Sequence, residues 1–300
     1  MIRRLLFAAA AVASFPLILG PSPAAIAAPA SDLIQMGHIS IKAVGKGDPV
    51  ILIPGLASPR AVWDGVLPEL AKHHRVYLVQ VNGFAGDEPR DNLTPGVIDG
   101  LVAELHAYIV EHKLQGAAVV GHSLGGLAGL MLAKAHPGDV GRLMVVDALP
   151  FIGEIFVPGA TVAMVEPRAA AMRDQLIAGY GKPADKPALD ATAAALALKP
   201  ASRAQVSAWS AAADPRVVGQ AMYEDLTTDL RPGMAAIATP ITLVYPWSAG
   251  MPKARAEPFY RTAYAGAPNM TFIDVGDAAH FVMLDQPEAF RAALAAFLAT

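Results

Sequence analysis

The stretch that decides the fold is Val119-Val120-Gly121-His122-Ser123-Leu124-Gly125-Gly126. Apolar, β-branched residues precede Ser123 and an Ala- and Leu-rich segment follows it, so we expect a strand to end and a helix to begin at this serine. Gly121 and Gly125 leave room for the sharp turn that exposes its hydroxyl. The new helix would present the Leu124 backbone N–H to an oxyanion. The motif therefore predicts a nucleophilic serine beside an oxyanion donor.

Short apolar strands alternate with helical segments on both sides of this motif. We expect strands at 39–44, 49–53, 75–81, 117–120, 143–146, 241–245 and 270–275, and helices at 60–72, 95–113, 124–136, 253–265 and 287–299. This rhythm predicts an α/β fold with a mostly parallel central sheet and helices on both faces. Gly45-Lys46-Gly47 lacks the third glycine of a dinucleotide-binding loop and predicts a hairpin turn instead.

A helical block interrupts this rhythm. Residues 151–232 are rich in Ala and Met and show no clear strand, whereas 28–150 and 233–300 carry the α/β pattern. We expect 151–232 to form a helical lid insertion over the pocket. Six of its apolar residues could line a site for acyl chains, although ordinary core packing explains such spacing more often: Phe151, Phe156, Met164, Met172, Trp209 and Met222.

The N-terminus and the composition limit where this chain works and what it binds. Arg3 and Arg4 precede an apolar run from Leu5 to Leu19, and Ala25-Ile26-Ala27 offers a signal-peptidase site. Residues 1–27 therefore predict a cleaved signal peptide and a periplasmic or secreted protein, with an uncleaved membrane anchor as the alternative. The net charge is −3, Lys and Arg do not cluster on any later segment, and cysteine is absent. We expect no nucleic-acid partner, no disulfide and no stable membrane span after cleavage.

Three stretches resemble the α/β-hydrolase superfamily, and the resemblance runs from about residue 38 to the end. They are Ile51-Leu52-Ile53-Pro54-Gly55-Leu56, Gly121 to Gly126, and Gly276-Asp277-Ala278-Ala279-His280-Phe281-Val282-Met283-Leu284-Asp285-Gln286-Pro287. The family often has His-Gly where this chain has Pro54-Gly55. The resemblance implies that the backbone N–H of Leu56 is the second oxyanion donor, and a proline before the glycine removes no needed donor.

The order of catalytic residues in this fold, serine then acid then histidine, predicts the general base. Only His136 and His280 follow Ser123. His136 lies 13 residues along the helix that Ser123 opens, about 20 Å away at the helical rise. His280 lies in a loop after the last predicted strand, where it can return to Ser123, so we expect His280 to be the base.

The carboxylate that would pair with His280 is less obvious, because the usual position for it carries no Asp or Glu. Similar proteins place an Asp shortly after the strand at 241–245, where this chain has Ser248 and no carboxylate between 245 and 252. A second known position is the end of the preceding sheet strand, here Asp147. Three possibilities stay open: Asp147 completes a triad, Ser248 or a water substitutes weakly, or Ser123 and His280 act as a dyad. We expect Asp147 to serve, and Asp277 to point away.

These residues predict a serine hydrolase that cleaves a small carboxylic ester with an apolar acyl part through an acyl-enzyme. No cofactor or metal is implied, because no metal-ligand spacing and no phosphate-binding loop occurs in the sequence. Two alternatives remain. One is carbon–carbon hydrolysis or cofactor-free peroxidation on the same scaffold. The other is a binding protein that retained the fold and lost turnover. The oligomeric state is not predicted.

Overall fold

The computed structural model describes residues 33–299, so the predicted signal peptide at 1–27 lies outside the described residues. The strands are β1 (Leu33–Gln35), β2 (Ile39–Gly45), β3 (Asp48–Ile53), β4 (His74–Val81), β5 (Ala117–His122), β6 (Val140–Val146), β7 (Ile241–Trp247) and β8 (Met270–Gly276). The α-helices are α1 (Leu67–His73), α2 (Val97–His112), α3 (Leu124–Ala135), α4 (Val162–Ile177), α5 (Lys186–Leu196), α6 (Pro200–Ala212), α7 (Pro215–Thr227), α8 (Lys253–Ala263), α9 (Val282–Asp285) and α10 (Pro287–Leu298).

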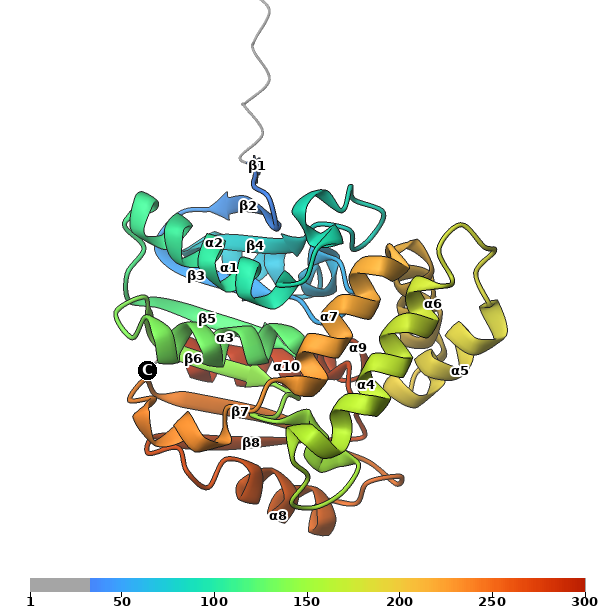
Figure 1. Cartoon of the computed structure of the whole chain (residues 1–300). Helices are drawn as coiled ribbons and strands as arrows, with labels where there is room; N and C mark the ends of the chain where they lie inside the picture. The colour runs from blue at the N-terminus through green and yellow to red at the C-terminus, as the bar shows by residue number, and fades with distance from the viewer. Residues whose placement is uncertain (1–32, 300) are drawn as a thin grey trace, which may run out of the picture. The chain divides into compact units, whose positions relative to one another are not determined.

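The eight strands form one sheet in the order β1-β2-β4-β3-β5-β6-β7-β8 (Figure 1). β1 and β2 are antiparallel to their neighbours, and the pairs from β4 to β8 are parallel. The mostly parallel α/β fold is therefore as predicted. The hairpin at Gly45-Lys46-Gly47 was a wrong prediction, because β4 lies between β2 and β3, and β2 pairs with β4 instead.

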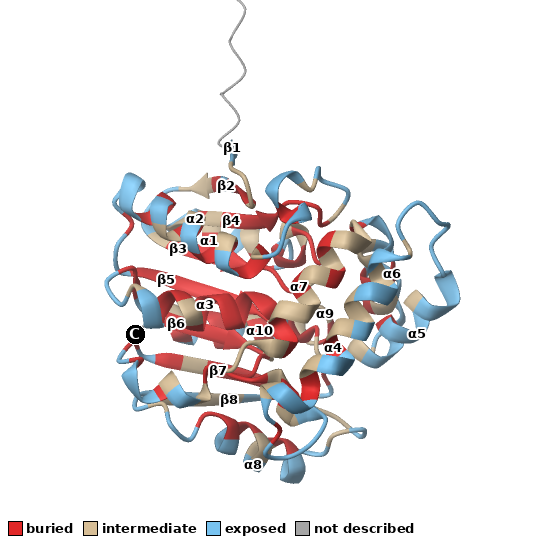
Figure 2. Cartoon of the chain, viewed as in Figure 1, coloured by how far each residue is buried: buried red, intermediate tan, exposed pale blue. Residues whose placement is uncertain are grey.

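Two apolar layers cover the sheet, one on each face. Alternate residues of a strand point to opposite faces, so Val119 packs in the layer of α2, α3 and α8, while Val120 packs in the layer of α1 and α10. The central strands are buried along most of their length (Figure 2). The predicted helix at 60–72 is instead a short 3₁₀ helix, Arg60–Trp63, followed by α1, with Trp63 fully buried between sheet and helix.

Residues 151–232 form the helical insertion between β6 and β7, and α4 to α7 gather beside one end of the sheet (Figure 1). α4 packs along α7, and α5 along α6. Glu224 of α7 accepts hydrogen bonds from the first backbone N–H groups of α2, which fastens the insertion to the sheet layer. Among residues 33–299, none of the helices combines the length and the hydropathy needed to cross a bilayer.

Candidate active site

Ser123 occupies the sharp turn between β5 and α3. Its backbone has φ 54° and ψ −125°, outside the usual regions for a residue with a side chain. The glycines around it make the turn possible. A Cβ on Gly121 would lie 2.1 Å from the Gly125 carbonyl oxygen, and one on Gly125 would lie 2.4 Å from the Ile53 carbonyl oxygen. The turn therefore needs glycine at both positions.

Asp147 and His280 form the hydrogen bond expected of an acid and its histidine. Asp147 Oδ2 lies 2.7 Å from His280 Nδ1. Asp147 directly follows β6, whose Val146 pairs with His122 of β5, so Ser123 and Asp147 leave neighbouring strands side by side. His280 comes from the loop after β8. The structure thus brings the predicted acid to the predicted histidine, and the contact falls within the range of a short, charge-assisted hydrogen bond.

The other oxygen of Asp147 also has a donor. The Tyr260 hydroxyl, on α8, donates a hydrogen bond to Asp147 Oδ1. Burial alone would raise the pKa of Asp147, but the hydrogen bonds from His280 and Tyr260 and the nearby imidazole hold it below its usual value. The side chain therefore stays ionised as a carboxylate that orients His280. The sequence offered no motif for Tyr260, which lies in an ordinary amphipathic helix.

His122, next to Ser123, is fully buried and supports the loop that carries His280. Its Nε2 donates to the His280 backbone carbonyl oxygen at 3.0 Å, and the two imidazole rings lie 4.5 Å apart. Burial and the neighbouring His280 lower the pKa of His122 to about 3. His122 is consequently neutral and acts as a structural donor to the loop.

A small cavity of about 140 Å³ opens beside these residues. Its wall contains Ser123, Leu127, Asp147, Ala148, Leu149, Ile152, Ile155, Asp225, Phe259, Tyr260 and His280. The helical insertion contributes Ile152, Ile155 and Asp225. None of the six insertion residues considered as possible lining is in this wall, so the structure does not place them at the site. Met164 and Phe156 are exposed, and Phe151 is buried in a separate small cluster.

The predicted oxyanion donors lie on two segments that meet at Ser123. Leu124 begins α3, so its N–H is one of the first-turn donors with no acceptor inside the helix. The loop of Leu56 also approaches closely, because a Cβ on Gly55 would lie 2.9 Å from Ser123 Cβ. Both segments thus lie close to the serine.

A family model described as the alpha/beta hydrolase family matches residues 50–293. The chain belongs to the alpha/beta hydrolase family. A pimeloyl-[acyl-carrier protein] methyl ester esterase of Aeromonas hydrophila is 32% identical over 142 residues, which are 47% of this chain and 52% of that relative. The enzyme of the same name from Edwardsiella ictaluri is 27% identical over 259 residues, covering 84% and 93%. The chain thus spans about half the length of the first relative.

Solved structures show the same fold. An esterase from Thermogutta terrifontis superposes with a TM-score of 0.72 at 19% identity, covering 89% of this chain and 98% of that one. At this identity, the likeness shows the architecture alone. The eight-stranded sheet and the position of Ser123 at the end of β5 agree with membership of the alpha/beta hydrolase family.

Other predicted residues of this alpha/beta hydrolase lie away from the contact between Asp147 and His280. Ser248 closes a small turn in which its backbone N–H and that of Met251 bond to each other's carbonyl oxygens. Asp277 is exposed, and its carbonyl oxygen accepts from Gln286. Sequence reasoning missed Tyr260 and a fully buried carboxylate, Asp285, whose oxygens accept from the backbone N–H groups of Leu198, Lys199 and Ala279.

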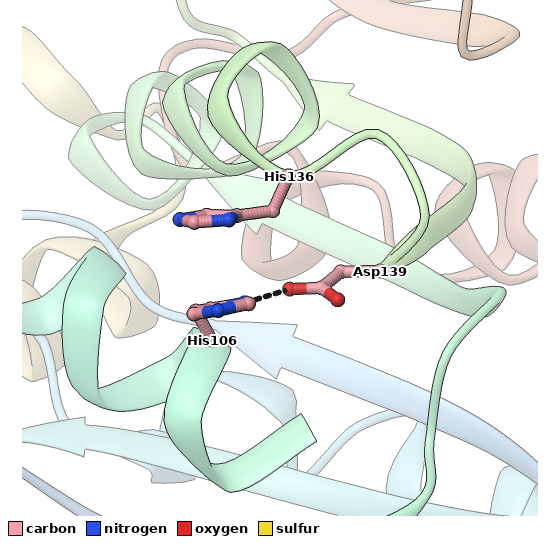
Figure 3. Close-up of side chains that lie close together, drawn as sticks. All are labelled: His106, His136 and Asp139. Atoms are coloured by element: carbon pink, nitrogen blue, oxygen red, sulfur yellow. Dashed lines mark hydrogen bonds and ion pairs between the residues drawn. The ribbon is translucent and has the colours of Figure 1, made fainter. Parts of the chain in front are cut away.

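One group among residues 33–299 brings three metal-binding side chains together, and it lies at the far end of α3 from Ser123. Figure 3 shows His106 and Asp139 joined by a hydrogen bond, with His136 stacked on His106. His106 Nδ1 lies 2.7 Å from Asp139 Oδ2. The two rings are 3.5 Å apart and within 8° of parallel. Because a metal lies in the plane of each ligating imidazole, one ring would have to turn for both to bind one ion. The stack as it stands joins α2 to the end of α3.

Proposed function

We propose that this alpha/beta hydrolase cleaves small carboxylic esters through an acyl-enzyme on Ser123. The observation that carries the proposal is the convergence of Ser123, His280 and Asp147 in the wall of one cavity, with Asp147 bonded to His280 Nδ1. With Nδ1 donating to the carboxylate, Nε2 of His280 is the free base that can take the serine proton. The methyl ester esterases to which the chain is similar support ester substrates.

The reaction would proceed in two halves on these residues. Ser123 Oγ attacks the ester carbonyl carbon as His280 takes its proton, and the backbone N–H groups of Leu56 and Leu124 receive the oxyanion. The alcohol leaves with the proton from His280. Water, deprotonated by His280, then attacks the acyl-enzyme and releases the acid. Asp147 keeps the imidazole in the required tautomer throughout.

The cavity favours a short, apolar acyl group. Its volume of about 140 Å³ is below that of pockets for drug-sized ligands, and its wall is more apolar than polar, with Leu127, Leu149 and Ile152. We propose in addition that the protein works outside the cytoplasm, supported by the charged start, the apolar run and the small-residue site before residue 28. N-terminal sequencing of protein from the source cell tests this, and a mature chain that begins at Met1 would contradict it.

The deciding experiment pairs active-site labelling with turnover. A fluorophosphonate should label wild-type protein at Ser123 and leave Ser123→Ala unlabelled, and Ser123→Ala should lower kcat for a short ester by about 10³-fold or more. Folding of the variant is checked by circular dichroism. Activity within tenfold of wild type would overturn the assignment of Ser123. Labelling without turnover of any ester, carbon–carbon or peracid substrate would favour the binding protein.

A further inference from the structure

Asp225 is a carboxyl group in the wall of the active-site cavity that the proposed ester chemistry does not use. It lies on α7 of the helical insertion, is 8% exposed, and faces the cavity together with Ser123 and His280. The rest of the wall contributed by the insertion is apolar, namely Ile152 and Ile155. On the insertion side of the wall, Asp225 is therefore the one acidic group beside two aliphatic side chains, in the same cavity as Ser123 and His280.

This carboxyl has no hydrogen-bond donor from the described part of the chain. Other acids of the same helical insertion are satisfied: Asp214 bonds to Arg216, Asp229 to Arg231, and Glu224 to the first turn of α2. Burial, opposed only by the electrostatic attraction of His280, raises the pKa of Asp225 to about 7. An unpaired buried carboxyl costs stability, so an apolar residue would serve packing better at this position.

We propose that Asp225 forms a polar subsite that binds a hydrogen-bond donor, a hydroxyl or an amide N–H, on the acyl part of the ester and disfavours a carboxylate there. The cavity wall supports this assignment, because Asp225 is the acid on the insertion side that a ligand reaching Ser123 would meet. A carboxyl oxygen accepts from a donor in either protonation state. A second carboxylate at the same place would be repelled in a site of low dielectric constant. The assignment rests on the proposed ester hydrolysis.

The test compares three methyl esters of nearly equal size: methyl butyrate, its beta-hydroxy derivative and monomethyl succinate, which carries a carboxylate. Each is assayed at about pH 8.5, where a carboxyl of this kind is ionised. In Asp225→Leu, kcat/KM for the hydroxylated ester, relative to methyl butyrate, should fall by about tenfold. In Asp225→Asn, the same ratio for monomethyl succinate should rise by about tenfold, because the repulsion is gone. The matched control is Asp174→Asn, which removes an exposed carboxylate on α4 outside the cavity and should leave both ratios unchanged.

A second measurement separates this proposal from ester hydrolysis itself. The Kd values of the same three esters are measured for Ser123→Ala protein with and without the Asp225 substitutions, which needs no turnover. If wild type hydrolyses none of them but the Kd ratios shift as above, ester hydrolysis fails and the subsite stands. If the esters are hydrolysed but every ratio stays within twofold of wild type, the subsite is wrong. Failure of all three esters to bind would overturn it as well.

Discussion

The Tyr260 hydroxyl bonds to Asp147 Oδ1, the carboxylate oxygen that His280 does not use. Both oxygens of Asp147 are therefore occupied, one by His280 and one by a tyrosine from α8. A carboxylate with one free oxygen can rotate about its Cβ–Cγ bond, whereas this one is held from two sides. Tyr260 is a positioning residue for the pair, because it acts on His280 only through Asp147.

Tyr260→Phe removes only this donor and should lower kcat/KM by about tenfold, the loss expected for one hydrogen bond to a charged group. Since that bond holds down the pKa of Asp147, the acid limb of the pH–rate profile should move to higher pH. Tyr264→Phe is the matched control, because its buried hydroxyl donates to the Ala148 carbonyl oxygen rather than to the carboxylate. Equal pH profiles for Tyr260→Phe and wild type would show that the tyrosine only fills space.

Asp147→Asn should lower kcat by up to about 10⁴-fold with the fold preserved, because an amide favours the wrong tautomer of His280. The chain contains its own control. Asp139 bonds to His106 at the same distance of 2.7 Å but lies at the far end of α3, so Asp139→Asn should leave kcat within about twofold. Ser248→Asp should not raise activity if the site is already complete. A large gain in activity from Ser248→Asp, or near-normal activity in Asp147→Asn, would show that Asp147 does not complete the triad.

The sequence predicted the sheet, the serine turn, and the contact between Asp147 and His280, because each depends on local pattern and chain order. Glycine spacing around Ser123 and the apolar run before Asp147 are readable without coordinates. Tyr260 and Asp285 were missed because their partners lie 113 and at least 6 residues away, in contacts that only tertiary packing creates. The residues that line the cavity could not be named from the sequence for the same reason: helical spacing places Met164 on a helix face but does not say which face meets Ser123.

The observed cavity wall identifies the substitution that should alter acyl preference. Ile152 lines the cavity beside Leu149, so Ile152→Ala should enlarge the site and raise kcat/KM for longer acyl esters relative to short ones by several-fold. Met164→Ala, on the exposed face of α4, is the control and should leave the profile unchanged. The measurement is kcat/KM across a series of esters of graded acyl length. If Met164→Ala shifts the profile and Ile152→Ala does not, the acyl group contacts a different part of the insertion from the one that carries Ile152.

His122 predicts a specific sensitivity to acid. The pKa of His122 in the folded protein, about 3, lies below the ordinary value of 6.5. Between these two pH values, His122 therefore takes up a proton when the protein unfolds. The stability that neutral His122 contributes is complete above about pH 6.5 and is lost as the pH falls toward 3. From pH 7.5 to 4.5, His122→Gln should therefore lose less free energy of unfolding than wild type, by about 1–3 kcal/mol. Urea unfolding at both pH values measures this, with exposed His73→Gln as the control. The same acid-induced loss in wild type and His122→Gln would contradict it.

Asp285 joins the histidine loop to the helical insertion. Its Oδ2 accepts from Leu198 N at 2.9 Å and Ala279 N at 3.1 Å, and its Oδ1 accepts from Lys199 N at 3.1 Å. Asparagine keeps one acceptor and turns an amide N–H toward a backbone donor. We therefore expect Asp285→Asn to lower the free energy of unfolding by about 2–4 kcal/mol.

The same substitution should also lower kcat by about tenfold at a temperature where the variant is fully folded, because Ala279 precedes His280 and the loop loses its anchor. KM for a short ester should change little, since Asp285 is absent from the cavity wall. Asp190→Asn is the control: that carboxylate bonds to Lys186 and Ser207 on the exposed side of the insertion, so both stability and kcat should stay near wild type. A variant that loses stability but keeps kcat would show that Asp285 holds the insertion in place without positioning His280.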